Sequence, residues 1–150
     1  MAEGCRLVKM SVFSDQMTAP LKAEWLLHLD PKAAVREVSG RLEATLGDAT
    51  LDLHRLAPEG GGLTWALHDV AKPEVEPFTF RKTQRVVYEP LFAGHDVTIL
   101  TLLHARAAND PALDDAKGTL RGRKAHVAWS RHGTRVTLEW DLERRKVVIR

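Results

Sequence analysis

The stretch DPKAAVREVSGRLEATLG, residues 30–47, decides how the rest of the chain is interpreted. Asp30 is a favourable N-cap residue, and Pro31 suits the first turn of a helix. Apolar residues then recur as they do on one face of a helix: Ala34, Val35, Val38, Leu42 and Leu46. Gly47 can take the left-handed conformation in which helices often end. The stretch therefore predicts one amphipathic helix over residues 31–46, packed through its apolar stripe on a sheet.

The segments around this stretch alternate between apolar and polar residues, which is the pattern of half-buried strands. It predicts strands over residues 5–13, 22–29, 50–56 and 63–70. The segment PEGGG, residues 58–62, predicts a turn that joins the last two strands as a hairpin. The order of strand, strand, helix, strand, strand resembles the β-grasp arrangement of ubiquitin-like domains over about residues 5–70. Helix-grip and hot-dog folds, which also wrap a sheet around one long helix, stay open as alternatives.

The second half of the sequence is rich in strand patterns. Residues 78–90 and 97–105 predict a strand pair with its turn near residues 93–96. A helix over residues 96–109 is the competing interpretation, but the β-branched Val97, Thr98 and Ile99 favour a strand. Three further strands are expected over residues 118–131, 135–141 and 146–150, with turns at residues 132–133 and 142–145.

The fold class expected from these elements is α+β, with mainly antiparallel sheet and one principal helix packed on one face. The first half has the β-grasp-like order, and the second half is rich in strands. Residues 1–150 are expected to form a single domain. Its candidate internal boundary is the proline-containing segment near residues 71–77.

Composition places the chain among ordinary globular proteins, since 44% of its 150 residues are hydrophobic and 28% are charged. No apolar run is long enough to cross a bilayer, and the N-terminus lacks the layout of a signal peptide. The single cysteine, Cys5, cannot form an internal disulfide. We therefore expect a protein of a reducing compartment, the cytoplasm, with no membrane partner.

Charge is distributed unevenly along the chain. The formal net charge is +2, but residues 1–75 hold 8 Lys and Arg against 11 Asp and Glu, whereas residues 116–150 hold 10 against 3. The acid-free segment 117–135 supplies candidates for contacts with nucleic-acid phosphates: Arg121, Arg123, Lys124, Arg131 and Arg135. By strand alternation Trp129 and Trp140 fall on apolar faces. We therefore expect both rings in the core and not beneath nucleic-acid bases.

Three histidines, His28, His54 and His68, fall on the polar faces of their predicted strands. If these strands are neighbours, the imidazoles and Asp52 can bind Zn²⁺ or act as general acid and base. Their spacing matches no zinc signature, and the sequence has neither a phosphate loop nor a serine nucleophile elbow. We therefore predict no metal and no cofactor.

These observations support three hypotheses about function. The first is a non-enzymatic protein–protein interaction or assembly module, whose short strands offer edges to a partner protein or to a second copy of the chain. The alternative is nucleic-acid binding through the basic C-terminal third. A further alternative is a small enzyme with a pocket lined by Trp25, Trp65 and a histidine. The lack of a reactive motif favours the first hypothesis.

Overall fold

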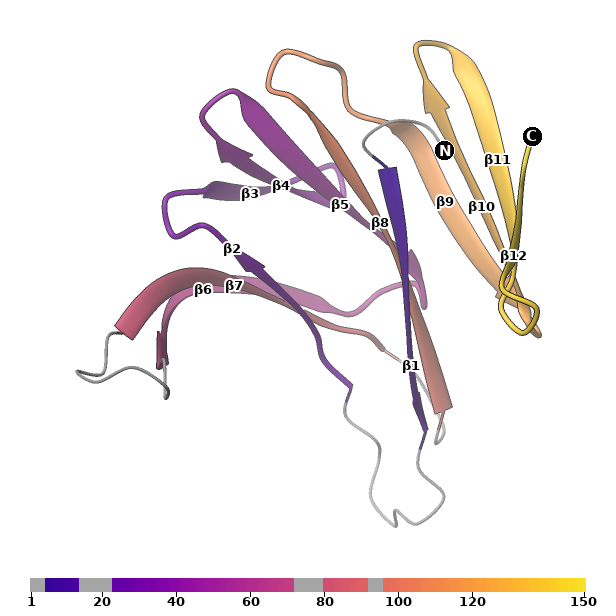
Figure 1. Cartoon of the computed structure of the whole chain (residues 1–150), viewed down its shortest axis with the longest axis horizontal. Helices are drawn as coiled ribbons and strands as arrows, with labels where there is room; N and C mark the ends of the chain where they lie inside the picture. The colour runs from indigo at the N-terminus through magenta and orange to yellow at the C-terminus, as the bar shows by residue number, and fades with distance from the viewer. Residues whose placement is uncertain (1–4, 14–22, 72–79, 92–95) are drawn as a thin grey trace.

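The computed structural model describes residues 5–13, 23–71, 80–91 and 96–150. Within these residues the regular structure consists of strands, and no segment is helical. In this described part of the chain, twelve strands form three antiparallel sheets (Figure 1). The described part of the chain therefore holds no helix of the length and hydropathy that crossing a bilayer requires.

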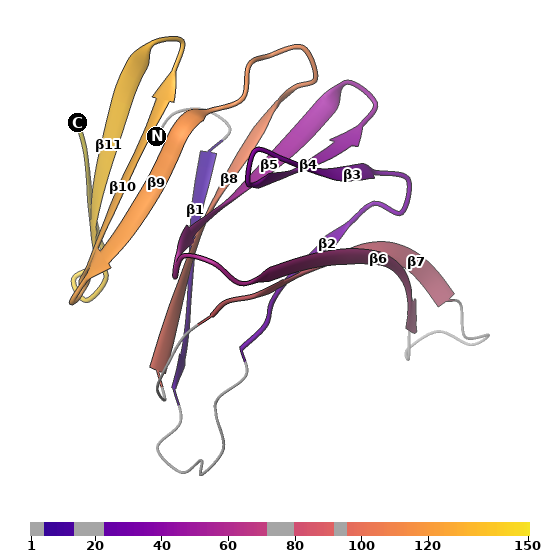
Figure 2. The ribbon, with the colours of Figure 1, turned by 180° about the vertical axis from the view of Figure 1, so that it is seen from behind.

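A five-stranded central sheet lies between the other two sheets (Figures 1 and 2). Its strands, in spatial order, are β1 (Cys5–Phe13), β8 (Asp96–Ala107), β5 (Ala49–Ala57), β4 (Arg41–Leu46) and β3 (Ala34–Val38). The small sheet consists of β2 (Trp25–Leu29), β7 (Phe80–Glu89) and β6 (Gly62–Ala71). The C-terminal sheet is the meander of β9 (Asp114–Arg121), β10 (Lys124–Arg131), β11 (Thr134–Asp141) and β12 (Lys146–Ile149).

The central sheet buries both of its faces. Toward the C-terminal sheet, Leu100 and Leu102 pack in one core with Val127 and Trp129. On the opposite face Ile99 belongs to a second core, shared with the small sheet. A strand buried on both faces needs apolar residues at consecutive positions, which explains the run ILTLL in β8. The prediction of a central strand here, and not of a helix, is confirmed.

The helix predicted over residues 31–46 is wrong. Most of these residues form β3 and β4, an antiparallel hairpin whose turn is Ser39 and Gly40. Both turn residues have left-handed backbones, with φ of 49° and 79°, as a two-residue hairpin turn requires. This turn moves the core-facing positions from odd numbers in β3, such as Val35, to even numbers in β4, such as Leu42 and Ala44. Taken together, the apolar residues of β3 and β4 are therefore spaced much as they would be on one face of a helix.

Asp30 begins a turn and not a helix. Its carboxylate Oδ1 accepts a hydrogen bond from the backbone N–H of Lys32 at 2.8 Å, and its backbone O accepts one from Ala33 at 3.0 Å. This turn carries the chain from β2 in the small sheet to β3 in the central sheet. Because the described residues contain no helix, the α+β class and the β-grasp-like order are wrong, and the helix-grip and hot-dog alternatives are excluded with them. The described fold is all-β.

Most predicted strands exist, but several predicted pairings are wrong. Strands β5 and β6 flank the turn over residues 58–62 and belong to different sheets, so they form no hairpin. Strands β7 and β8 also belong to different sheets, so the strand pair predicted over residues 78–90 and 97–105 does not form. The strand predicted over residues 118–131 is two strands, β9 and β10, whereas the turns at residues 132–133 and 142–145 are confirmed. The candidate boundary near residues 71–77 lies outside the described residues except for Ala71.

Tyr88 anchors the connection between β5 in the central sheet and β6 in the small sheet. Its ring is fully buried, and its hydroxyl can donate a hydrogen bond to the carbonyl O of Pro58 at 2.8 Å or to that of Gly60 at 3.0 Å. Gly61 comes so close to the end of β7 that a Cβ at this position would clash with the carbonyl O of Glu89. The connection therefore depends on a glycine at this position.

Gly118 lies where β9 packs closely on the central sheet. A Cβ at this position would lie 2.7 Å from Leu56 Cβ and 3.3 Å from Leu100 Cδ2. We expect Gly118→Ala to lower the free energy of unfolding by about 1–3 kcal/mol, because the added methyl group overpacks this core. Urea unfolding followed by circular dichroism measures the effect.

The matched control is Gly62→Ala at the start of β6, where the nearest atom to an added Cβ is 4.0 Å away. We expect the control to change stability by no more than about 0.5 kcal/mol. Equal losses in the two variants would contradict the close packing of β9 on the central sheet.

Candidate functional site

A row of ionisable side chains crosses the central sheet. Strand register aligns Arg36 of β3, Glu43 of β4, Asp52 of β5 and His104 of β8. Asp52 and His104 are fully buried, and Glu43 is 3% exposed. His104 alternates with Leu102 on β8, so the row continues the apolar face that packs on the C-terminal sheet. Buried charges of this kind are tolerated only when they are paired.

Arg106 of β8 pairs with both acids of the row. Its Nε donates to Asp52 Oδ2 at 2.7 Å and its Nη2 to Asp52 Oδ1 at 3.2 Å, which makes a two-point contact. Its Nη2 also donates to Glu43 Oε1 at 3.1 Å. Its Nη1 donates to the backbone O of Asp110 at 2.7 Å, and this bond ties the loop after β8 to the row. The hydrogen bond to Asp52 raises the pKa of Arg106.

Two further arginines hold Glu43 in its ionised form. Arg36 Nε donates to Glu43 Oε2 at 2.9 Å, and Arg41 Nη2 donates to Glu43 Oε1 at 2.7 Å. Burial acts to raise the pKa of Glu43, but the hydrogen bonds from Arg41 and Arg36 outweigh burial and lower it. Arg41 also reaches the centre of the row, since its Nε lies 3.8 Å from Asp52 Oδ1.

Asp52 is the anion at the centre of this network. Burial acts to raise its pKa, but hydrogen bonds from His104 and Arg106 and the charges of Arg106 and Arg41 lower the pKa to about 2. The contact with His104 is long, at 3.4 Å from Nδ1 to Asp52 Oδ2. A carboxylate with so low a pKa is a poor general base near neutral pH. We infer that Asp52 organises the sheet through its paired charge.

His54 lies beside the row and faces a pocket. Its side chain is nearly buried, and burial lowers its pKa to about 4, against the opposing effect of the Asp52 charge. The imidazole is therefore neutral at pH 7, and its Nε2 has no hydrogen-bond partner among the described residues. The pocket measures about 380 Å³ and lies between the turn at Ser39 and Gly40 and the start of β9.

The structure does not bring the three predicted histidines together. His28 of β2 and His68 of β6 lie on the outer face of the small sheet, whereas Trp25 and Trp65 face its core. His54 lies on the face of the central sheet that is turned toward the C-terminal sheet. Trp25 and Trp65 therefore lie on a different sheet face from each of these three imidazole rings. Among the described residues, no three metal-binding side chains gather in a way that could hold an ion.

The predicted nucleic-acid contacts divide among three places. Arg121, Lys124 and Arg135 lie on the outer face of the C-terminal sheet, because they alternate with the residues that form the core. Arg123 lies in the turn between β9 and β10, where it forms an ion pair with Glu143. Arg131 ends β10 on the opposite side of the sheet, in alternation with the outer-face residues.

The two tryptophans of the C-terminal sheet face inward. Trp129 is 3% exposed, and the partly buried Trp140 packs against the same core. The prediction that both rings belong to the core is confirmed. The cations of the outer face consequently have no tryptophan beside them on which a base could stack.

Sequence reasoning missed Glu43, His104 and Arg106. The signal lay in the alternation, since His104 follows Leu100 and Leu102 at the spacing of one buried face. A polar residue at such a position needs a partner. That partner is on β5, and the sequence alone does not reveal which strands are neighbours.

Comparison with known proteins finds no match among protein-family models, curated proteins or solved structures.

The buried His54 makes the stability of the fold depend on pH. Its pKa of about 4 lies below the ordinary value of 6.5, so the unfolded chain binds the proton more readily. The free energy of unfolding should therefore fall as the pH is lowered from about 6.5 to 4, by about 3 kcal/mol from this residue. Asp52, whose pKa is depressed from 3.8 to about 2, adds a further loss only below about pH 4.

Urea unfolding across this pH range compares the parent protein with His54→Gln. We expect the variant to lose less stability between pH 6.5 and 4, because the titrating ring is gone. His28→Gln, on an exposed position of the small sheet, is the control and should behave as the parent does. A His54→Gln variant with the full pH dependence of the parent would contradict this assignment.

Proposed function

We propose that this chain is a protein-interaction module that binds an extended acidic segment of a partner protein as an added strand beside β12. The observation that carries the proposal is the exposed edge of the C-terminal sheet. Within the described residues β12 has one neighbouring strand, β11. Its Val147, Val148 and Ile149 are 48%, 36% and 44% exposed. An unpaired strand edge with exposed apolar side chains is a template on which another strand can add.

The register of β12 identifies the backbone groups that are open to a partner. Thr137 and Arg150 exchange two backbone hydrogen bonds, at 3.0 and 2.9 Å. Because such pairs alternate along antiparallel strands, Val148 also directs its backbone toward β11. Val147 and Ile149 then direct their N–H and C=O groups away from the sheet. An added strand would form its hydrogen bonds with these two residues.

The outer face of the C-terminal sheet favours an acidic partner. Three of its paired rows contain five cations and two acids: Lys117, Arg121, Lys124, Lys146 and Arg150, with Glu139 and Asp141. Lys124 and Glu139 neutralise each other through an ion pair of 2.7 Å. The positive charge that remains lies partly at β12, on Lys146 and Arg150, and partly on β9 at the opposite edge of the sheet, on Lys117 and Arg121. It would attract an acidic chain and fix its orientation.

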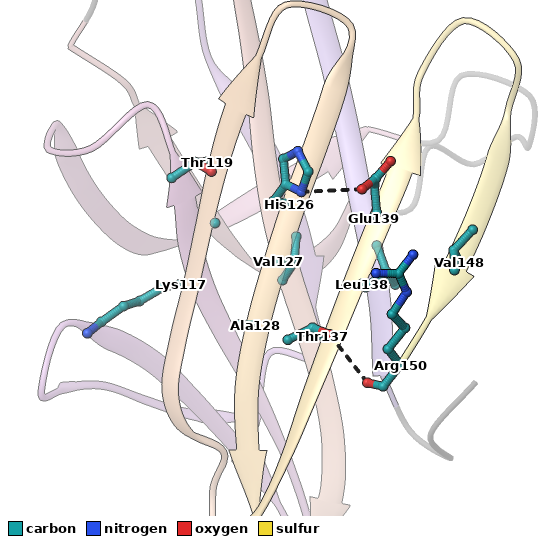
Figure 3. A pocket seen from close by; sticks show the side chains of 11 residues that line it. Lys117, Thr119, His126, Val127, Ala128, Thr137, Leu138, Glu139, Val148 and Arg150 are labelled. Atoms are coloured by element: carbon teal, nitrogen blue, oxygen red, sulfur yellow. Dashed lines mark hydrogen bonds and ion pairs between the residues drawn. The ribbon is translucent and has the colours of Figure 1, made fainter.

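A shallow pocket of about 320 Å³ adds a place for a partner side chain. It is formed on the same outer face by β9, β10, β11 and the end of the chain (Figure 3). His126 and Glu139 point toward each other across β10 and β11, with 3.8 Å between Nδ1 and Oε2 (Figure 3). Val148 and Arg150 form the side of the pocket at β12. The pocket is therefore continuous with the strand edge.

The β3 edge of the central sheet is a poorer acceptor of a strand than β12. Its edge strand β3 carries the exposed, ion-paired Arg36 and Glu37, and charged side chains on an edge discourage strand addition.

The cytoplasm is the compartment that we propose for the interaction, because the chain has a single cysteine and so gains nothing from an oxidising environment.

Strand addition is tested with two substitutions at one position of β12. Ile149→Pro removes a backbone N–H that points away from the sheet. Ile149→Thr keeps this N–H and reduces only the apolar surface of the side chain. The probe is a labelled peptide of alternating glutamate and valine, measured by fluorescence anisotropy against a peptide of alternating lysine and valine. We expect the acidic peptide to bind at least about tenfold more tightly than the basic one, and Ile149→Pro to abolish this difference.

Ile149→Thr is expected to bind the acidic peptide within a few fold of the parent. Equal losses in the two Ile149 variants, or equal binding of the two peptides, would contradict strand addition.

The alternative function, nucleic-acid binding, predicts a different result with a single-stranded oligonucleotide. Its affinity would fall steeply with salt and with Lys117→Ala and Arg121→Ala, and it would be unchanged in Ile149→Pro.

A further inference from the structure

The pocket beside His54 has walls of opposite charge. It lies between the β3–β4 turn and the first residues of β9, away from the outer face of the C-terminal sheet. The central sheet contributes Arg41 and Arg55 to one wall. The start of β9 contributes Asp114 and Asp115 to the other.

Arg41 is the residue of the basic wall that can still donate to a ligand. Its Nη2 is bonded to Glu43 and its Nε lies near Asp52, but its Nη1 has no hydrogen-bond partner among the described residues. Its side chain is 19% exposed to solvent. Arg55, in contrast, is occupied by Glu37 and by the backbone O atoms of Gly40 and Gly61.

The acidic wall is open. Asp114 and Asp115 are exposed, and neither forms an ion pair with any residue that the structure describes. Their carboxylates can therefore accept hydrogen bonds from a cationic group.

His54 supplies the independent sign that a ligand belongs here. Its side chain is 8% exposed and lines the pocket, yet its buried Nε2 has no hydrogen-bond partner in the described part of the chain. A buried polar atom without a partner is uncommon in a native fold and costs free energy until something bonds to it. A neutral imidazole can act as donor or acceptor, according to its tautomer.

We propose that this pocket binds a small zwitterion of the amino-acid type. Its carboxylate pairs with Arg41, its ammonium group lies between Asp114 and Asp115, and His54 completes the hydrogen bonds at the base. A simple cation would bring a second positive charge to Arg41, and a simple anion would face two carboxylates. A molecule with both charges satisfies both walls. The site is separate from the β12 edge, so either proposal can fail without the other.

Isothermal titration calorimetry tests the site with ω-amino acids of increasing length: glycine, 4-aminobutyrate and 6-aminohexanoate. Butyrate and n-butylamine are the matched probes that carry one charge each. We expect at least one of the zwitterions to bind about tenfold more tightly than both single-charge probes. Binding of butyrate or n-butylamine as tight as that of the best zwitterion, or no binding of any zwitterion at millimolar concentration, would overturn the proposal.

Exposed carboxylates can be altered without disturbing the buried row, so the test has a variant that should fold. The double substitution Asp114→Asn and Asp115→Asn is expected to weaken the best zwitterion about tenfold and to leave the unfolding midpoint unchanged. Asp48→Asn, in the exposed β4–β5 turn, is the control and should bind as the parent does. Unchanged binding in the double variant would overturn the assignment of the acidic wall.

Discussion

A carboxylate with no solvent contact lies in the middle of the central sheet, and the fold has to neutralise it. Asp52 meets Arg106 through two hydrogen bonds, at 2.7 and 3.2 Å. A buried acid that loses its main partner costs several kcal/mol, so the strands that carry these two residues are held in one register. A slip of one residue would send the two side chains to opposite faces of the sheet. We infer that this ion pair selects the pairing of β5 with β8.

The same arginine connects the centre of the fold to its periphery. Its bond to the backbone O of Asp110 fixes the loop that leads into β9, and β9 then packs through Gly118 on Leu56 and Leu100. The position of the C-terminal sheet follows from these contacts, and with it the pocket beside His54 and the open edge of β12. The buried row is therefore scaffold, and the two binding surfaces that we propose lie at the rim of the fold.

Alternation in the sequence was a sound guide to where strands lie, and a poor guide to how they pair. β1 has the predicted bounds, and the apolar run of β8 correctly indicated a strand buried on both faces. The error at residues 31–46 arose because a two-residue turn shifts the alternation and produces a helical spacing. Ser39 and Gly40 were the missed signal. The buried row could not be predicted, since Asp52 and His104 belong together only once β5 and β8 are known to be neighbours.

A double-mutant cycle on Asp52 and Arg106 tests the central claim most directly. Arg106→Met alone should lower the free energy of unfolding by about 3–5 kcal/mol, because it leaves Asp52 buried without its main partner. Asp52→Leu alone should also destabilise the fold, and the double variant should lose less than the two single losses together, by about 1 kcal/mol or more. Strictly additive losses would show that the two side chains do not depend on each other, and would contradict the account.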